Sequence, residues 1–423
     1  MIRLLGYISY HIGLTGYEWL VYLAALWNHK AKLFISGRKG LIKKITQKTA
    51  TDTRYKIWFH CASLGEFEQA RPIIERMKRE YPQYAIVVTF FSPSGYEVRK
   101  NYQGADYIFY LPLDSALNAL LFVSALKIKF AFFVKYEIWY HYLKTLNEFS
   151  IPIFLISANI RSDHVYVKWY GVFFREMLHC FNHIFSQNET SNSLLLQNGF
   201  TNASVSKDTR FDRVFENSKQ VRELSLIQQF VQNKKVLILG SSYAQEEMVV
   251  EACMEYLKDW KIIIAPHHIQ TSRITDICSR FKTYGVTTFS ALSNDLTNTQ
   301  KNILVIDNIG MLSSIYQYGT VAFIGGGYGK NGLHNTLEAA VFGMPVLFGP
   351  NNLKKFPESL DMLVAGVGFV IKEATQFAKH INTWNQHPEQ LRQIGDKAKQ
   401  FIVSQTGATQ HIFDYLQSVK LLS

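Results

Sequence analysis

Cysteine is scarce in this sequence, which has 423 residues and four cysteines. Cys61, Cys180, Cys253 and Cys278 are widely separated, and no two of them form a Cys-x-x-Cys pair. This spacing argues against both a disulfide framework and a zinc site. We expect four buried thiols in a reducing compartment.

Sequence patterns of nucleic-acid-binding proteins are missing as well. No zinc-finger, basic-zipper or RNP-type pattern occurs, although the formal net charge is +12. Acidic residues are rare where the positive charge is densest, because Asp52 is the only acid between Lys30 and Lys56. This basic stretch directly follows an apolar segment, a combination that favours an anionic membrane over nucleic acid as a partner.

The apolar segment runs from Leu4 to Trp27 and contains His11 and Glu18. It is long enough to cross a bilayer, which takes about 20 residues. Its tyrosines and tryptophans are typical of segments at the headgroup level, and the basic residues after it predict a cytoplasmic location for the rest of the chain. No small-residue cleavage site follows, so we do not expect a removed signal peptide. We expect a spanning anchor or an interfacial helix at a membrane; the alternative is a helix packed on the first domain.

From Ile57 onward, short apolar strands alternate with amphipathic helices. The alternation pauses in a polar helical stretch from Asp208 to Asn233 and restarts at Lys235, which places the domain boundary near residues 212–233. Repeated strand–helix units predict parallel sheets with helices on both faces. The chain is also too long for one ordinary domain of about 100–200 residues.

We therefore expect an α/β protein with two doubly wound, Rossmann-like domains that face each other across a cleft, where the carboxyl ends of the strands bind ligands. Residues 1–45 are assigned to a membrane anchor and basic segment, residues 46–212 to the first domain, and residues 213–423 to the second domain with its C-terminal helices.

In the second domain, one strand ends on a run of glycines ("TVAFIGGGYG"), and a helix then begins at "HNTLEAAVFG". Glycine lets backbone approach a ligand closely, and free N–H groups at a helix start favour phosphate. Asn335 and Glu338 are three residues apart on one helical face, so Glu338 can accept hydrogen bonds from ribose hydroxyls. The alternative is a capped core helix in which Glu338 satisfies its own N-terminus.

Two further loops of the second domain follow predicted strands. "IIAPHH" places Pro266 and His267 directly after a strand, where a histidine is often only a loop residue. "DNIGMLSSIY" places Gly310 and Met311 at a helix start, where backbone N–H groups can meet a base or a phosphate.

In the first domain, "HCASLGEFEQARP" places Glu66 at a junction between loop and helix, where it can accept a proton from an attacking hydroxyl. Acids are common in the first turn of helices, so the alternative is that Glu66 or Glu68 only complements the helix dipole. "VKYEIWY" places Glu137 after another strand, with a first-turn acid as the alternative. "SKDTRFDR" supplies Arg210, which can stabilise a departing phosphate.

Taken together and in this order, these stretches resemble the 3-deoxy-D-manno-octulosonic acid (Kdo) transferases, the lipid A glycosyltransferases of Gram-negative bacteria. The resemblance covers nearly the whole chain and rests on "ASLGEFEQARP", "KYEIW", "DTRFDRV", "APHH", "DNIGMLS" and "GGGYGKNGLHNTLEAAVFGMPVLFGPNNLKKFPE". It implies a GT-B fold with a membrane-attached N-terminus. It also implies inverting transfer of Kdo from CMP-Kdo to a lipid A precursor of the lipid IVA type, without a covalent enzyme intermediate.

The resemblance carries roles for single residues. Glu66 resembles the proton acceptor of the family, and Glu137 and Arg210 resemble its transition-state stabilising pair. The positions that resemble its CMP contacts are Pro266, His267, Ile309, Gly310, Met311, Asn335, Thr336, Leu337 and Glu338. No cofactor is implied beyond the donor, and no Asp-x-Asp metal clasp is visible in the sequence. The implied partners are CMP-Kdo, the lipid A precursor and the anionic inner membrane.

The sequence departs from the family pattern in several places. Arg210 stands where many members have lysine, which keeps the charge and changes the geometry. Met311 stands where many have glutamate, so only backbone contacts are expected there. Lys207 replaces the usual glycine, and Tyr328 to Leu333 resembles an insertion.

Two other functions remain open at this point. Fold alone does not exclude another GT-B glycosyltransferase or a sugar-nucleotide epimerase, and thermal protection by CMP rather than UDP would discriminate between them. A non-catalytic membrane-surface protein that uses the basic stretch is the alternative from a different class.

Overall fold

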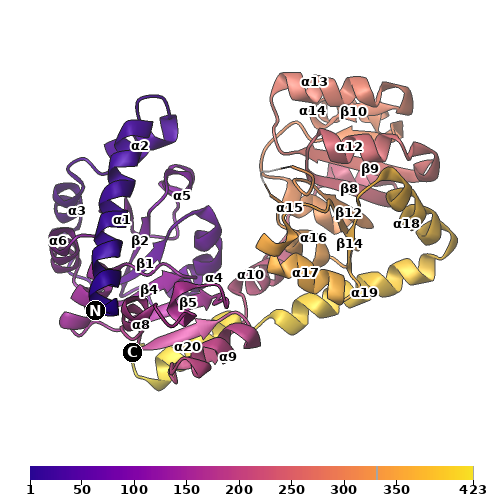
Figure 1. Ribbon diagram of the computed structural model, residues 1–423. Coiled ribbons are helices and arrows are strands. Elements are labelled where there is room, and N and C mark those ends of the chain that lie inside the picture. The colour runs from indigo at the N-terminus through magenta and orange to yellow at the C-terminus, as the bar shows by residue number, and fades with distance from the viewer. Residues whose placement is uncertain (330–331, 423) are drawn as a thin grey trace. The chain divides into compact units, whose positions relative to one another are not determined.

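The computed structural model describes residues 1–329 and 332–422. The chain divides into two compact units, shown in Figure 1. Unit 1 contains Met1–Arg213 and Thr406–Ser423, and unit 2 contains Val214–Gln405. The division differs from the predicted domains in two respects: residues 1–45 are part of unit 1, and so is the end of the chain, which the sequence assigned to the second domain.

The C-terminal helix α20 (Ala408–Ser418) explains this second correction. Its apolar side buries Ile412, Phe413 and Leu416 in the same core as Phe154 and Phe185 of unit 1. Burial of apolar side chains is the main favourable term in packing, so this helix is part of the unit 1 fold.

Unit 1 is built on a seven-stranded parallel sheet. Its strands are β1 (Lys56–Cys61), β2 (Ala85–Phe90), β3 (Tyr107–Tyr110), β4 (Ile128–Val134), β5 (Ile153–Ala158), β6 (His183–Ser186) and β7 (Ala203–Val205), in the order β3-β2-β1-β4-β5-β6-β7. From β1 the chain builds the sheet outward through β2 and β3, and it then places β4 on the other side of β1. The point between β1 and β4 is therefore the topological switch point, where open α/β sheets bind ligands.

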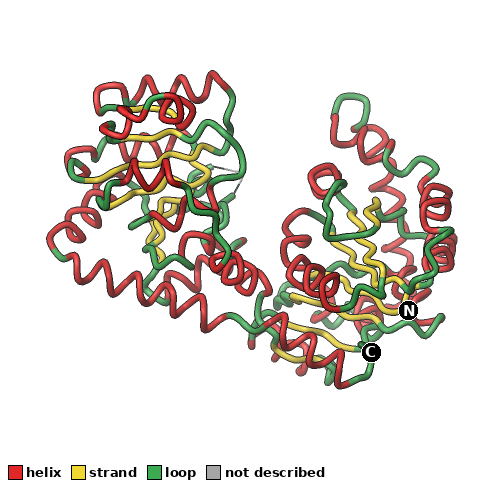
Figure 2. Tube along the Cα trace, turned by 180° about the vertical axis from the view of Figure 1, so that it is seen from behind, coloured by secondary structure: helices red, strands yellow, loops and turns green. Residues whose placement is uncertain are grey.

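Helices cover both faces of this sheet, which is the yellow layer between red helices in Figure 2. They are α4 (Leu64–Glu80), α5 (Pro93–Arg99), α6 (Ala116–Leu126), α7 (Tyr140–Glu148), α8 (Val172–Leu178) and α9 (Glu189–Gln197), together with α20. Successive strand side chains point to opposite faces, so Trp58 and Phe133 lie in one core while Phe59 and Phe132 lie in the other. Strands buried on both faces read as continuous apolar runs, as these do.

Three helices precede the sheet: α1 (Ile2–Ala24), α2 (His29–Ser36) and α3 (Leu41–Thr49). The predicted N-terminal helix is thus confirmed, and α1 runs along unit 1 next to α8 (Figure 1). Tyr7 and Tyr10 of α1 pack their rings against Phe173 of α8. In the part of the chain that the structure describes, no helix combines the length and the apolar character that crossing a membrane requires.

Unit 2 also has a seven-stranded parallel sheet. Its strands are β8 (Lys235–Ser242), β9 (Trp260–Pro266), β10 (Val286–Thr288), β11 (Ile303–Val305), β12 (Val321–Ile324), β13 (Val346–Phe348) and β14 (Gly368–Val370), in the order β10-β11-β9-β8-β12-β13-β14. Its helices are α11 (Ser225–Val231), α12 (Ala244–Glu251), α13 (Thr271–Arg280), α14 (Phe289–Asn294), α15 (Leu312–Ile315), α16 (Leu337–Ala340), α17 (Pro357–Val364), α18 (Ala374–Gln386) and α19 (Pro388–Gln405); α10 (Thr209–Lys219) runs through the boundary between the units. The switch point of this sheet lies between β8 and β12.

The predicted α/β class with two doubly wound sheets is therefore confirmed. The strands expected before the quoted functional stretches are present, among them β1, β4, β9, β11 and β12, and two strands do not stand out from the alternation: β7 (Ala203–Val205) and β14 (Gly368–Val370). Both are three-residue strands at a sheet edge. The equally short β11 and β13 are wholly apolar and buried, whereas β7 contains Ala203 and Ser204 and β14 begins with Gly368, so neither forms the continuous apolar run that identifies a buried strand.

Candidate functional site

Two predicted acids of unit 1 lie beside its switch point. Glu66 follows β1 by a short loop, Glu137 follows β4, and β1 and β4 are neighbours in the sheet with His60 opposite Phe133. The carboxyl ends of these two parallel strands meet at one edge of the sheet, which is the expected place for a ligand.

Glu66 stands in the first turn of α4, three residues after the N-cap residue Ser63. Its carboxylate contacts the Ser63 hydroxyl, and its side chain is almost enclosed, with the residue 8% exposed. The Nζ of Lys135 lies 3.8 Å from Oε1 of Glu66. Burying a carboxylate is costly unless it is paired, and Lys135 supplies the pairing charge. The position in the first turn also fits the alternative role at the helix start, so the role as proton acceptor stays a prediction.

Lys135 was not singled out from the sequence, although it stands two residues before Glu137. Its φ is +62°, in the left-handed region that side chains other than glycine rarely adopt. Its charge also helps to lower the pKa of Asp208. Lys135 is therefore a cation within ion-pair distance of the candidate base, and its backbone conformation is one that the surrounding fold must hold in place.

Glu137 is held by a chain of buried hydrogen bonds that the sequence did not indicate. The indole N–H of Trp139 donates to Oε2 of Glu137 and to Nε2 of His60, both at 3.0 Å. Because an indole nitrogen only donates, His60 accepts through Nε2 and donates from Nδ1 to the hydroxyl of Thr89 at 2.9 Å. Trp58 donates to the same hydroxyl at 2.8 Å. The carboxylate is thus anchored through Trp139 to the buried centre of the sheet.

The alternative role for Glu137, an acid in the first turn of a helix, is wrong. Helix α7 begins at Tyr140, after the N-cap position Trp139, and no acid lies in its first turn. The backbone N–H groups of His141 and Tyr142 donate instead to the carboxylate of Asp114, each at 3.2 Å. Asp114 therefore satisfies the start of α7 and leaves Glu137 to Trp139 and His60.

Arg210 is paired with the buried carboxylate of Asp208, two residues before it. Its Nη2 and Nε donate to Oδ2 of Asp208 at 2.7 Å and 3.0 Å, and Gln69 and Gln187 donate to the same oxygen. Burial alone would raise the pKa of Asp208, but the charge and hydrogen bonds of Arg210 keep it below its usual value. Asp208 therefore stays ionised and orients Arg210, using two of the five N–H groups of a guanidinium.

Glu68, which the sequence left as a possible partner of the helix dipole, belongs to an arginine cluster. Its carboxylate pairs with Arg99 at 2.7 Å and also contacts Arg213. These contacts give Glu68 a structural role on the side of α4.

Lys207 has a φ of +70°. Glycine adopts this conformation without strain, which accounts for the glycine that the family usually has at this position. The backbone conformation is thus kept in this chain although the residue differs.

In unit 2, the glycine run after β12 packs on the end of β8 and the first turn of α12. The N–H of Gly325 donates to the carbonyl of Gly240, and the N–H of Gly326 donates to the carboxylate of Glu246 at 2.9 Å. A Cβ on Gly325 would collide with the backbone of Ser241. The glycines are thus required first by the close approach of two protein segments, and approach to a ligand comes in addition.

A cluster of aromatic rings lies at the carboxyl ends of β8 and β9. The ring of His334 stacks against His267 at a centroid distance of 4.4 Å and against Tyr243 at 5.8 Å. Burial, with the neighbouring His267 and His268, lowers the pKa of His334 to about 4. Burial also lowers the pKa of His267. The rings are therefore uncharged near neutral pH, and neutral rings suit stacking on a planar group such as a nucleobase.

The predicted helix after "HNTLEAAVFG" is shorter than expected. Helix α16 is a single turn, Leu337–Ala340, and the chain then turns to Gly343, whose φ is +81°. The side-chain oxygen of Asn335 accepts from the N–H of Leu337 at 3.1 Å, and its amide donates to Glu338 at 2.9 Å. Asn335 thus caps the turn and orients Glu338, while a one-turn helix supplies little dipole for a phosphate.

The two residues between Asn335 and Glu338 are enclosed. Leu337 is fully buried and Thr336 nearly so. The hydroxyl of Thr336 has no hydrogen-bond partner among the residues described here. Leu337 can therefore act only through its backbone. Part of the predicted insertion from Tyr328 to Leu333, namely residues 330 and 331, lies outside the described residues.

The loop before α15 leads into a helix that shares a cavity with Glu338. Gly310 has a φ of +92° and Ile309 is 85% exposed, so this loop presents backbone at the surface. Ser313 and Ser314 of α15 line a cavity of about 200 Å³ together with Glu338. The structure thus brings together two of the stretches predicted to bind the nucleotide, the one that contains Ser313 and the one that contains Glu338. The ring of His267 also contacts the ring of His334, the residue before Asn335.

Within residues 1–329 and 332–422, no group of three or more His, Cys, Asp and Glu side chains is arranged to hold a metal ion. Metal independence of the reaction stays a prediction from the sequence.

Comparison with known proteins agrees with the resemblance predicted from the sequence. Residues 35–213 match the family described as 3-deoxy-D-manno-octulosonic-acid transferase (kdotransferase). The chain is 25% identical over 373 residues to the 3-deoxy-D-manno-octulosonic acid transferase of Haemophilus influenzae, covering 85% of this chain and 86% of that protein. It is 28% identical over 339 residues to the enzyme of that name from Aquifex aeolicus, covering 76% of this chain and 83% of that protein.

Among solved structures, the chain is similar to the UDP-GlcNAc 2-epimerase from Neisseria meningitidis bound to UDP-GlcNAc. The TM-score is 0.60 at 15% identity, covering 86% of this chain and 100% of that one. At this identity the likeness shows the fold alone, and it confirms the GT-B-like architecture of two parallel sheets.

Proposed function

We propose that this chain is a glycosyltransferase of lipopolysaccharide biosynthesis. It moves Kdo from CMP-Kdo to a lipid A precursor of the lipid IVA type. The chain is related to the Kdo transferases over most of its length. The observation that carries the proposal is the sequence relationship itself. The geometry supports it, because each predicted functional stretch follows the carboxyl end of a strand, on the side of the sheet where such folds bind ligands, and Glu66 and Glu137 lie beside the switch point of unit 1.

Donor binding is assigned to unit 2. Glu338, oriented by Asn335, accepts hydrogen bonds from the ribose hydroxyls of CMP. The backbone of Ile309 to Met311 and the uncharged ring of His267 at the end of β9 bind the rest of the nucleotide. No cofactor is assigned beyond this donor.

The chemistry is assigned to unit 1. Glu66 accepts the proton of the acceptor hydroxyl while the hydroxyl oxygen attacks the anomeric carbon of Kdo and the bond to the phosphate oxygen of CMP breaks. A single displacement of this kind inverts the anomeric centre. Arg210, oriented by Asp208, stabilises the negative charge that grows on the leaving phosphate. Glu137, anchored by Trp139, stabilises the positive charge that develops on the sugar ring.

We also propose that the chain works at the cytoplasmic face of the inner membrane, with α1 lying in the interface. One side of α1 packs on unit 1, and another side exposes large apolar residues, among them Leu4, Ile8, Trp19 and Leu20. The basic residues of the following helices are of the sign that anionic headgroups attract.

The proposal is tested first on the donor. CMP at a concentration 100 times its dissociation constant stabilises a protein by about 2.7 kcal/mol, which for a unit of this size raises the melting temperature by about 5–10 °C. UDP at the same concentration should have little effect. Release of CMP from CMP-Kdo should then depend on added lipid A precursor. Protection by UDP and conversion of UDP-GlcNAc would favour an epimerase; liposome binding without transfer would favour a membrane-surface protein.

A further inference from the structure

A cavity of about 520 Å³ lies in unit 1 beside the three N-terminal helices. Its size falls within the range of about 300–1,000 Å³ that is typical of small-molecule sites. Its apolar lining includes Val21 of α1, Phe34 and Ile35 of α2, Leu41 and Ile42 of α3, and Leu113 of the loop after β3. A cavity with walls of this kind suits a hydrocarbon chain.

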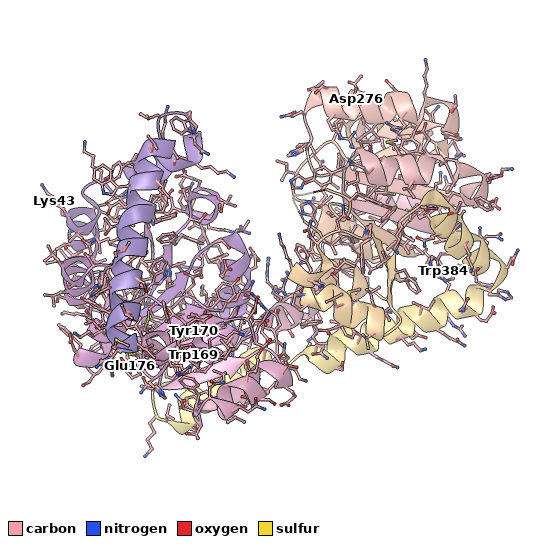
Figure 3. The ribbon with its side chains drawn as sticks, in the orientation of Figure 1. Lys43, Trp169, Tyr170, Glu176, Asp276 and Trp384 are labelled. Carbon is pink, nitrogen blue, oxygen red and sulfur yellow. The ribbon has the colours of Figure 1, made fainter. Side chains whose placement is uncertain are left out.

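The polar part of the lining is mainly cationic. Lys39 and Lys43 line the cavity and are exposed, and Figure 3 shows Lys43 at the surface of unit 1. Neither lysine has a carboxylate within ion-pair distance among the described residues, and Glu18 is the one acid of the lining. An apolar cavity with unpaired ammonium groups at its edge complements an acyl chain joined to a phosphate.

Arg38 connects the cavity wall to the loops that follow β2 and β3. Its guanidinium donates to the carbonyls of Phe34, Phe91 and Leu111 at 3.1, 2.7 and 2.9 Å, so it joins α2 to the loops after β2 and β3. Burial lowers its pKa to about 10, which still leaves it charged near neutral pH. Because three of its five N–H groups donate to these carbonyls, Arg38 shapes the cavity wall, and the exposed Lys39 and Lys43 are the more accessible cations for an anion.

The cavity is also close to the candidate acceptor site in the same unit. The ring of Phe91, which lies against Phe34 at 5.3 Å, also lies against the ring of Trp139 at 4.7 Å. Trp139 in turn donates to Glu137 at 3.0 Å. Two aromatic residues, Phe91 and Trp139, therefore connect the cavity wall to the carboxylate at the switch point.

We propose that this cavity binds one acyl chain of the acceptor lipid and that Lys39 and Lys43 bind a phosphate of the same molecule. The identity of the occupant rests on the proposed function, since that function makes the acceptor a phosphorylated, acylated sugar. Continuity with Glu137 favours the acceptor over a bulk membrane lipid as the occupant. Each methylene that enters such a site strengthens binding about fourfold.

Kinetics with two acceptors test the proposal. Ile42→Trp and Leu113→Trp each fill the cavity, and Leu117→Trp, at a 65% exposed position on α6, is the matched control. We expect both filling variants to raise the KM for the acylated lipid A precursor at least tenfold, with KM and kcat for its fully deacylated form unchanged. Equal effects on both acceptors, or no effect on either, would overturn the proposal.

The charge at the edge of the cavity is tested by Lys39→Gln combined with Lys43→Gln. The matched control is Lys44→Gln combined with Lys48→Gln, which makes the same change in net charge with two exposed lysines of α3 outside the cavity lining. We expect the first pair to raise the KM for the phosphorylated acceptor about tenfold and to leave the KM for its dephosphorylated form unchanged. Equal effects from both pairs would assign the lysines to a general surface attraction and would contradict the proposal.

A binding measurement separates this proposal from the proposed function. Isothermal titration calorimetry with dodecyl phosphate should show binding to the wild type, about fourfold weaker binding for each methylene removed, and loss of binding in Leu113→Trp. If no acceptor is glycosylated but this pattern is found, the proposed function fails and the cavity remains a site for an acyl phosphate. If transfer occurs but Leu113→Trp binds dodecyl phosphate as the wild type does, the cavity proposal fails alone.

Discussion

Unit 1 and unit 2 share one architecture but differ in what they place at the switch point. Unit 1 has charged side chains in fixed partnerships, namely Glu66 with Lys135, Glu137 with Trp139 and His60, and Arg210 with Asp208. Unit 2 has closely packed glycine loops and uncharged aromatic rings.

Two copies of one fold can thus take different parts in a transfer reaction. A proton acceptor needs a carboxylate whose charge is compensated and whose position is fixed. A nucleotide site needs backbone and ring surfaces that fit the ligand without bringing a competing charge. The carboxyl ends of the strands carry charged side chains in unit 1 and closely packed glycines and uncharged rings in unit 2, because the loops that follow the strands differ.

The largest effect is expected when the candidate base of unit 1 is removed and unit 2 is left unchanged. Glu66→Gln keeps the size of the side chain and removes its ability to accept a proton. Since general base catalysis contributes about 100- to 10,000-fold, we expect kcat to fall by that factor. Calorimetry should show unchanged CMP binding.

The control for this variant is Glu80→Gln, which changes an acid at the far end of the same helix. Glu80 pairs with Arg76 and Arg79 near the surface, and surface pairs contribute little. This control should retain wild-type kcat. Turnover near wild type in Glu66→Gln would remove Glu66 from its assigned role.

The reciprocal change acts on unit 2. Glu338→Gln replaces a charged acceptor of hydrogen bonds by a neutral one, which costs about 1.5–3 kcal/mol when the acceptor binds a ligand. We expect the KM for CMP-Kdo to rise about 10- to 100-fold, with kcat at saturating donor nearly unchanged. Steady-state kinetics with varied donor measure both.

An exposed acid of the same unit is the control here. Glu389→Gln changes the partner of His387 at the start of α19, and we expect it to leave the KM for the donor as it is in the wild type. A fall in kcat without a change in KM for Glu338→Gln would place Glu338 in the chemistry and would contradict the division of work.

A smaller effect tests how Glu137 is held in unit 1. Trp139→Phe keeps a ring against Phe91 and removes the N–H that reaches Glu137 and His60. Loss of one hydrogen bond to a charged group predicts a fall in kcat of about tenfold. The matched control is Trp169→Phe, because Trp169 is 77% exposed (Figure 3). If both variants keep wild-type kcat, the anchoring of Glu137 does not affect turnover.

The smallest predicted effect concerns a histidine in each unit. Burial lowers the pKa of His334 in unit 2 to about 4, and burial with the charge of His411 lowers that of His183 in unit 1 to about 4, from an ordinary value of 6.5. Between pH 6.5 and pH 4 the unfolded chain binds protons that the folded chain does not, so stability falls as the pH decreases through this window.

Thermal unfolding at pH 7 and pH 5 measures this loss. His334→Gln and His183→Gln should each reduce the difference in melting temperature between the two pH values by a few degrees, because each removes one of the two groups. A difference equal to that of the wild type in both variants would show that neither ring is held neutral by the fold.

The strands and the class of fold could be predicted because they depend on local patterns. Alternating apolar strands and amphipathic helices identified both sheets and placed the boundary near residue 213, where unit 1 gives way to unit 2. The sequence could not show that the helix after Asn335 is only one turn long. An apolar run has the same pattern whether the helix continues or the chain turns at Gly343.

The candidate acids could be predicted, but their partners could not. Glu66 and Glu137 stand within five residues of the ends of apolar strands, which is a signal in the sequence itself. His60 and Trp139, in contrast, are 79 residues apart along the chain, and Gln69 and Asp208 are 139 apart. Such contacts follow from the order of strands in the sheet, and no spacing in the sequence encodes that order.

Kdo transfer by Glu66 is best measured by mass spectrometry of the lipid product, after wild type and Glu66→Gln have each been incubated with CMP-Kdo and a lipid A precursor. The wild type should yield acceptor that is heavier by one or more Kdo residues, and the variant should yield none within the same time. Unmodified acceptor from the wild type, or equal product from both proteins, would contradict the account.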